Sequence, residues 1–195
     1  EILIGLVGSE MCIRDRADGI PLVLYNPPHA KRELTPAEWA TLKRHVPGLI
    51  GVKTNDRNSS PEWYGQVALH AAGLAVFVPG HHLATGVRLG AAGAYSNVAC
   101  LNPFAAQRWY ELMLTDMTAA LELEGRIQQF MERCITPFIV RMKYPNHACD
   151  RFMALVGGWA DVGSTLRWPY DSIPDSRVEE VRRQARQIIP EFFNL

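Results

Sequence analysis

Short, continuous apolar runs separated by helix-start signals are the feature of this sequence that most restricts its fold. The first two runs are PLVLY (21–25) and LIGVK (49–53), and LAVFV (74–78) and GAYSNVA (93–99) follow. Runs that are apolar at every position, rather than alternating, indicate strands buried on both faces, as in parallel sheets. Parallel neighbours need a crossover connection, and the stretches between the runs are long enough for one. The sequence therefore predicts successive right-handed βα units.

Capping signals place helices between and after these runs. The segment Thr35–Glu38 combines a capping box with proline at the first helical position, and it predicts a helix to about Val46. The segment Ser59–Glu62 predicts a second helix to about Ala72. No strand pattern remains beyond Asn102-Pro103, which caps a further helix. Later helices are expected from Asp116 to about Cys134, at 147–156, and from Ser176 to about Ile189.

Four βα units followed by a helical tail amount to half of an eight-stranded barrel. The expected fold class is therefore α/β, a partial (β/α)8 TIM barrel with a C-terminal helical extension. We expect the half-barrel to occupy residues 17–102. The last barrel helix and the helical extension would occupy residues 103–195.

Residues 1–16 fit none of these patterns. The stretch LVGSEMCIRDR (6–16) has no helical stripe and no strict alternation, and it lacks the cleavage site of a signal peptide. It resembles the translation of a transposon-end adapter used to prepare sequencing libraries. We therefore expect residues 1–16 to be a non-native, adapter-derived segment without a specific role in the fold, and the natural protein to begin near Ala17, in mid-gene.

Charge and composition argue against several classes of partner. The formal net charge is zero, which speaks against nucleic acid or an anionic membrane surface as a partner. No apolar run approaches the ~20 residues needed to span a bilayer. Beyond the N-terminal segment, the cysteines Cys100, Cys134 and Cys149 lie in apolar surroundings without a CxxC pair. We expect buried free thiols in a reducing cytoplasm, and no zinc site.

The chemistry of a β/α barrel gathers at the C-terminal ends of its strands. Tyr25 and Lys53 end two runs that would be neighbours about 4.8 Å apart, so both side chains would point into one mouth. Burial of an amine favours its neutral form, the nucleophile that forms a Schiff base with a carbonyl compound. A tyrosine hydroxyl beside it could relay protons. The alternative is that Lys53 begins a polar loop and reaches water, while Tyr25 packs beside the NPP turn.

Four segments in this order and spacing, LVLYNPP, GLIGVK, VPGHH and GAAGAYSNVACLNP, resemble the second half of the dihydrodipicolinate synthase / N-acetylneuraminate lyase family. These proteins are class I aldolases on a TIM barrel with a C-terminal helical extension. The resemblance covers residues 19–189 and implies barrel strands five to eight. It also implies an enzyme that needs no metal or organic cofactor, because the covalent imine is the electron sink. The full-length protein would be a cytoplasmic homo-oligomer, a dimer or a tetramer.

By this resemblance Lys53 is the Schiff-base lysine and Tyr25 the proton-relay tyrosine. The backbone around Tyr95, with Ser96, would help to bind the keto acid, and Gly80, also expected to contact substrate, matches the glycine that ends strand seven. We therefore expect a lyase or aldolase that acts on pyruvate or a related 2-keto acid when full length. The 195-residue chain alone, with half of the strands, is expected to be inactive and prone to associate through its sheet edges.

The chain departs from the pattern of that family at two places. Ala30 stands where dihydrodipicolinate synthases place an arginine that holds a substrate carboxylate, and Lys31 and Arg32 are the candidates to replace it. The acidic pair usual after strand seven is His81-His82, which offers too few ligands for a zinc site. These departures keep open a rival interpretation, a non-catalytic homologue that serves as a binding or assembly module. Whether an enzyme would be a synthase, an aldolase or a dehydratase also stays open. Its acceptor stays open because the residues that contact it would lie mostly in the first half of the barrel.

Overall fold

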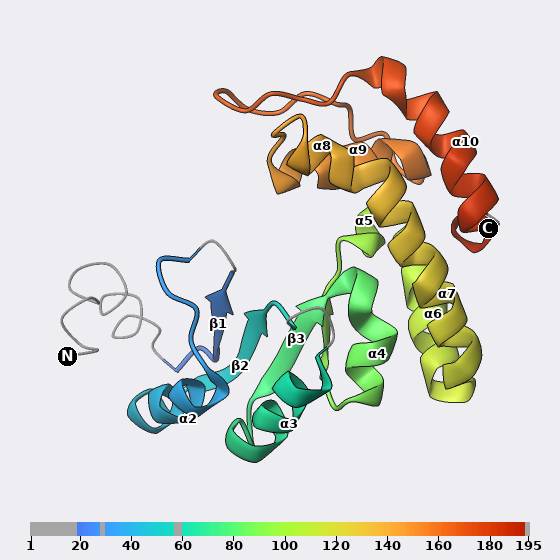
Figure 1. The fold of residues 1–195 in the computed structure, drawn as a ribbon. Helices are drawn as coiled ribbons and strands as arrows, with labels where there is room; N and C mark the ends of the chain where they lie inside the picture. The colour runs from blue at the N-terminus through green and yellow to red at the C-terminus, as the bar shows by residue number, and fades with distance from the viewer. Residues whose placement is uncertain (1–18, 28–29, 57–59, 194–195) are drawn as a thin grey trace. The chain divides into compact units, whose positions relative to one another are not determined.

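The computed structural model describes residues 19–27, 30–56 and 60–193, which fall into two compact units (Figure 1). The first unit comprises the described residues up to Val78 together with Leu89–Gly93, and the second comprises Pro79–Arg88 and the residues from Ala94 onward. Segment 1–16, with its adapter interpretation, lies outside the described residues. Within the described ranges, no helix has both the length and the apolar character needed to cross a bilayer. The proposed division at residue 102 stays a prediction.

The strands form a four-stranded sheet in the order β1-β2-β3-β4. They are β1 (Leu22–Asn26), β2 (Leu49–Thr54), β3 (Ala75–Pro79) and β4 (Gly93–Tyr95). The pairs β1–β2 and β2–β3 are parallel, which confirms the predicted βα units. The last strand is shorter than the predicted run 93–99. The reason is local, because the Ser96 hydroxyl accepts a hydrogen bond from the Ala99 amide at 3.2 Å and thereby turns the chain into helix α5 (Val98–Leu101).

The core of the first unit lies on one face of its strands, against helices α2 (Pro36–His45) and α3 (Pro61–His70). Trp39 of α2 and Tyr64 of α3 are buried in one cluster with Val52 of β2. Full burial of an aliphatic side chain such as that of Val52 contributes about 1.5–3 kcal/mol. The cluster is completed by buried Ala71, Val76 and Val78 and by partly buried Leu24, Leu34, Trp63, Val67, Leu74, Leu89 and Ala91.

The other face of β1 is open. Register pairs Tyr25 with Lys53, so these two residues share a face, and Val23 lies two residues earlier on the same strand. Val23 is 36% exposed and Tyr25 is 56% exposed. The expectation that these runs are buried on both faces is therefore wrong for β1, because helices cover only one of its faces in the part of the chain that the structure describes.

Both helices of the first unit begin at the predicted caps. The Glu38 amide donates to the Thr35 hydroxyl at 3.3 Å, and the Thr35 amide donates to the Glu38 carboxylate at 2.8 Å, which closes the capping box. The hydroxyl of Ser60 accepts from the Trp63 amide at 3.3 Å. Each cap satisfies amides that the first helical turn would otherwise leave unpaired.

The second unit is helical beyond Tyr95. Its α-helices are α4 (Leu83–Arg88), α5, α6 (Pro103–Thr115), α7 (Met117–Phe130), α8 (Thr136–Val140), α9 (Asn146–Gly157) and α10 (Val178–Ile188). Short helical turns occupy Gly80–His82, Met131–Ile135, Asp175–Arg177 and Pro190–Phe192. The helices predicted from Asn102, from Asp116 and at 147–156 are confirmed. The Ser176 cap is wrong, because Ser176 lies inside a 3-10 turn and Arg177 precedes α10 without a side-chain cap.

Two buried polar side chains tie distant parts of this unit together. Asn102 is 2% exposed; its oxygen accepts from the amides of Phe104 and Ala105, and its nitrogen donates to the Phe192 carbonyl at 2.9 Å. Glu124 of α7 is 3% exposed and accepts from the amide of Thr85 at 3.1 Å and from its hydroxyl. A buried polar group is costly unless it is hydrogen-bonded, so both contacts fix the packing of the segments that they join.

Helices α5 and α9 approach so closely that only glycine fits at their contact. A Cβ atom added at Gly157 would lie 1.6 Å from the carbonyl oxygen of Leu101. By contrast, a Cβ added at Gly125, on the exposed side of α7, would meet nothing within 4 Å. An added methyl group would therefore clash with the backbone of α5 at position 157, whereas at position 125 it would have open space.

We expect Gly157→Ala to lower the free energy of unfolding by about 1–3 kcal/mol or more, because the backbones of α5 and α9 must separate. Gly125→Ala is the matched control, and it should raise the free energy of unfolding by about 0.5–1 kcal/mol through helix propensity. Urea denaturation followed by circular dichroism measures both changes. A Gly157→Ala variant as stable as the parent chain would contradict the close approach.

Candidate functional site

Two residues expected to be catalytic meet in the first unit. Tyr25 of β1 and Lys53 of β2 are register partners, and the Lys53 Nζ atom lies 4.3 Å from the centroid of the Tyr25 ring. A lysine ammonium over an aromatic face is attracted by about 0.5–1 kcal/mol at an exposed site. The amine and the phenol ring are therefore held together at the ends of neighbouring parallel strands.

The environment of this pair is more open than expected. Lys53 is only half-buried and Tyr25 is 56% exposed, so the expectation of a lysine desolvated at a buried strand end is wrong. The cause is the open face of β1, on which both side chains lie. Because the Lys53 amine is not enclosed in the hydrophobic core, a small solute can reach it.

Buried polar residues anchor the loops that follow both strands. Asn26 is the last residue of β1, and its side chain accepts from the Leu34 amide at 2.8 Å and donates to the Arg32 carbonyl at 3.3 Å. After β2, the carboxylate of fully buried Asp56 accepts from the Tyr64 hydroxyl at 3.3 Å. Sequence reasoning treated these positions only as turn or loop residues. The available signal was a polar residue at or just beyond the end of an apolar run.

In the described part of the loop after β1, from residue 30 onward, Arg32 and Lys31 are the two candidates for a charge that binds a substrate carboxylate. Arg32 forms an ion pair with Glu38, whose carboxylate also completes the capping box of α2. Ala30 is half-buried, and its amide donates to the carbonyl of Pro27 at 3.0 Å. Arg32, one of two candidates to replace the arginine missing at position 30, is therefore already paired, and Lys31 is exposed.

A second group of predicted site residues gathers in the second unit. A Cβ atom added at Gly80 would lie 2.3 Å from Ser96 Oγ and 2.7 Å from Asn97 Oδ1, so the close approach of these segments requires glycine. The side-chain nitrogen Nδ2 of Asn97 lies 3.3 Å from Nδ1 of His81. The Gln128 side chain donates to the His81 carbonyl at 3.3 Å, and this contact holds the turn from α7. Gln128, which lies far along the chain from the strand ends, is a residue that the sequence did not single out.

Ser96 and Tyr95 have different surroundings. The Ser96 hydroxyl accepts from the Ala99 amide, so it takes part in starting α5, while the Tyr95 side chain is 53% exposed. Their expected contacts with a keto acid stay predictions. The five predicted site residues thus form two groups: Tyr25 and Lys53 in the first unit, and Gly80, Tyr95 and Ser96 in the second.

Histidines and cysteines in the described ranges form no metal-binding cluster of three or more potential ligands. The rings of His81 and His82 instead contact each other edge to face, with centroids 4.3 Å apart. Cys100, Cys134 and Cys149 are free thiols, as predicted, although Cys100 is only half-buried. Burial, with a smaller effect of Asp150, raises the pKa of Cys100 and of Cys149 to about 11, so both are protonated at neutral pH.

Comparison with known proteins gives matches among solved structures alone, since neither a protein-family model nor a curated protein matches this chain. A prophage protein of E. coli K12 from the dihydrodipicolinic acid synthase family, in complex with pyruvate, is 19% identical with a TM-score of 0.70. It covers 93% of this chain, which in turn covers 62% of it. For the sialic acid aldolase of Ruminococcus gnavus, the identity is 21%, the TM-score 0.67, and the coverages 93% and 58%.

Dihydrodipicolinate synthase from Agrobacterium tumefaciens is also similar, with 21% identity, a TM-score of 0.63 and coverages of 85% of this chain and 53% of that one. Identities this low establish a shared fold. The chain therefore has the fold of dihydrodipicolinate synthase and N-acetylneuraminate lyase family proteins, as its sequence motifs predicted. It spans about 60% of their length, which agrees with the predicted partial β/α barrel.

The raised pKa of Cys149 predicts slow alkylation. A pKa of about 11, against an ordinary value of 9.0, leaves roughly a hundredfold less thiolate at pH 8. We therefore expect iodoacetamide to modify the Cys149 peptide about a hundredfold more slowly in the folded chain than in urea, as measured by mass spectrometry. The folded rate should rise steadily as the pH increases from 8 toward 11. Equal rates in both states would show that the thiol is not protected.

Proposed function

We propose that this chain is part of a Schiff-base lyase that acts on pyruvate or a related 2-keto acid. The observation that carries this proposal is the pairing of Tyr25 with Lys53 at neighbouring strand ends, with the amine 4.3 Å from the ring centroid. These are the positions at which the family resemblance calls for an imine-forming lysine and a proton-relay tyrosine. One of the similar structures is a complex with pyruvate and another is an aldolase, which supports the same chemistry here.

In the proposed reaction, the neutral amine of Lys53 attacks the keto carbon of the substrate. The resulting carbinolamine loses water, and a protonated imine forms that withdraws electrons from the adjacent carbon. A carbon–carbon bond to that carbon then breaks with its electron pair moving into the enamine, or forms by the reverse step. The hydroxyl of Tyr25 carries protons to and from the adduct. This chemistry requires neither a metal nor an organic cofactor.

Local structure prepares the pair for this role. Contact with the Tyr25 ring limits the positions that the flexible Lys53 side chain samples, and the open face gives a keto acid access to the amine. The anchored loops after β1 and β2, held by Asn26 and Asp56, keep both strand ends in place. Positioning of this kind lowers the entropic barrier of a reaction between two groups. We further propose that the whole protein works as a cytoplasmic homo-oligomer.

A non-catalytic barrel that binds or assembles is the second candidate. Arg32 forms an ion pair with Glu38, and the side chain of Ala30 is neutral, so neither residue is placed to bind a substrate carboxylate. Both observations favour a non-catalytic barrel. The same observations favour an aldolase or dehydratase over a synthase, if the protein is an enzyme. Retention of Tyr25 and Lys53 in contact argues for catalysis. A test of imine formation separates the two candidates.

In a protein that carries the whole barrel, we expect pyruvate and borohydride to add a reduced keto-acid mass to the Lys53 peptide. Lys43 is an internal control, because its ammonium is hydrogen-bonded to the carbonyls of Pro47 and Leu49. Lys53→Arg should abolish trapping, since a guanidinium stays charged and cannot attack. Labelling of another lysine, or no labelling with a panel of 2-keto acids, would refute the proposed lyase activity. The non-catalytic binding module would then be the remaining candidate.

Tyr25→Phe should reduce kcat by about 10²–10⁴-fold, because it removes the proton relay. The ring that contacts Lys53 remains, so the thermal unfolding curve should change little. Steady-state kinetics alongside a circular dichroism melt would measure both effects. Activity within a few-fold of the parent enzyme would assign Tyr25 to positioning of the lysine alone.

A further inference from the structure

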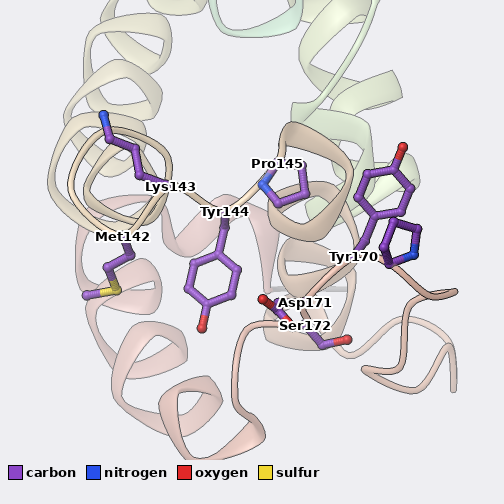
Figure 2. Close-up of a pocket in the computed structure, with 8 residues that line it drawn as sticks. Met142, Lys143, Tyr144, Pro145, Tyr170, Asp171 and Ser172 are labelled. Carbon is purple, nitrogen blue, oxygen red and sulfur yellow. The ribbon is translucent and has the colours of Figure 1, made fainter.

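A pocket in the second unit combines aromatic and apolar walls with an acidic side chain. It lies between segment 142–145, which links α8 to α9, and segment 169–172, in the connection from α9 to α10 (Figure 2). Its volume is about 540 Å³, within the ~300–1,000 Å³ typical of sites for small molecules. Its lining residues, all in the described part of the chain, include none of the five predicted site residues. The pocket is therefore separate from the proposed keto-acid site.

Both segments that form the pocket are anchored to the unit behind them. Tyr144 packs against buried Phe138 with ring centroids 6.2 Å apart, and its amide donates to the Phe138 carbonyl at 3.0 Å. On the other segment, the Ser172 hydroxyl accepts from the Leu166 amide at 2.9 Å, and the next residue, Ile173, is buried. The hollow is therefore formed by the fold itself, as is usual for sites that bind small molecules.

Charge is distributed unevenly around this pocket. Of the residues that line it, Lys143 and Asp171 carry a formal charge. Figure 2 shows the Tyr144 ring extending toward the side of the pocket that carries Asp171, whereas the Lys143 side chain extends away from both. Within the ranges that the structure describes, the Asp171 carboxylate forms no ion pair. The pocket therefore combines an aromatic wall with a carboxylate that is available to a cation.

We propose that this pocket binds a small organic cation, a substituted ammonium, with Asp171 as its counter-ion and the Tyr144 ring as one wall. The face of an aromatic ring attracts a cation, and substituted ammonium groups are the ligands that proteins commonly bind in this way. The thioether of Met142 and the rings of Pro145 and Pro169 provide apolar surface for the alkyl groups of such a cation. The carboxylate repels an anion, and a neutral molecule would displace its water without pairing with it. A substituted ammonium is therefore the ligand that matches both the charge and the walls.

Binding of tetramethylammonium to the 195-residue chain tests this inference, which does not depend on the proposed activity. We expect saturable binding with a dissociation constant of about 1 mM, as measured by ligand-observed NMR titration. The matched neutral probe is tert-butanol, which has the same number of non-hydrogen atoms and no charge. It should bind at least several-fold more weakly, because it cannot pair with Asp171. Absence of saturable cation binding, or equal binding of the two probes, would overturn the proposal.

Matched pairs of variants locate the bound cation. Asp171→Asn removes the charge at nearly constant size and should raise the dissociation constant several-fold, whereas Asp161→Asn, at an exposed position that does not line the pocket, should leave it unchanged. Tyr144→Leu should also weaken binding several-fold, and Tyr144→Phe, which keeps the ring face, should not. Circular dichroism melts check that each variant is folded. If Asp171→Asn binds tetramethylammonium as tightly as the parent chain does, the cation lies elsewhere and the proposal is wrong.

Discussion

Parallel pairing of β1 with β2, in constant register from Val23 onward, is the constraint on which the candidate site depends. It places Tyr25 directly opposite Lys53, and a shift of one residue would turn one of these side chains to the opposite face of the sheet. Helices α2 and α3 maintain the register by packing on the opposite face, around Val52. The hydrophobic core and the polar site are therefore two consequences of the same alternation along each strand.

Local signals in the sequence predicted most of the fold. Capping residues and apolar runs act over a few residues, so the helices and strands that they predict depend little on the rest of the chain. Thr35, Asn102 and Asp116 accordingly cap helices as expected. Ser176 does not cap the last helix, because it lies inside a 3-10 turn that starts one residue earlier, at Asp175. Contact between Tyr25 and Lys53 was predictable because both residues end adjacent parallel strands.

The remaining features depend on contacts between distant residues, which spacing along the chain does not reveal. Gly80 shows this, since the atoms that exclude a side chain there belong to Ser96 and Asn97. The same holds for the hydrogen bonds from Thr85 to Glu124, which link residues 39 positions apart. The open face of β1 was missed for a related reason. An apolar run indicates that both faces of a strand tolerate burial, but it does not indicate which helices or strands cover each face.

The hydrogen bond from Asn102 to the Phe192 carbonyl has a consequence for the order in which the second unit assembles. It joins residues 90 positions apart, and closing a loop of that length costs about 4 kcal/mol in chain entropy. The contact can form only after residue 192 has left the ribosome, long after α6 has been synthesised. Helices α6 and α7 are adjacent in sequence and can pair early, whereas the buried amide of Asn102 must stay hydrated until the last turn docks. Completion of this unit during synthesis is therefore a late, chain-length-dependent event.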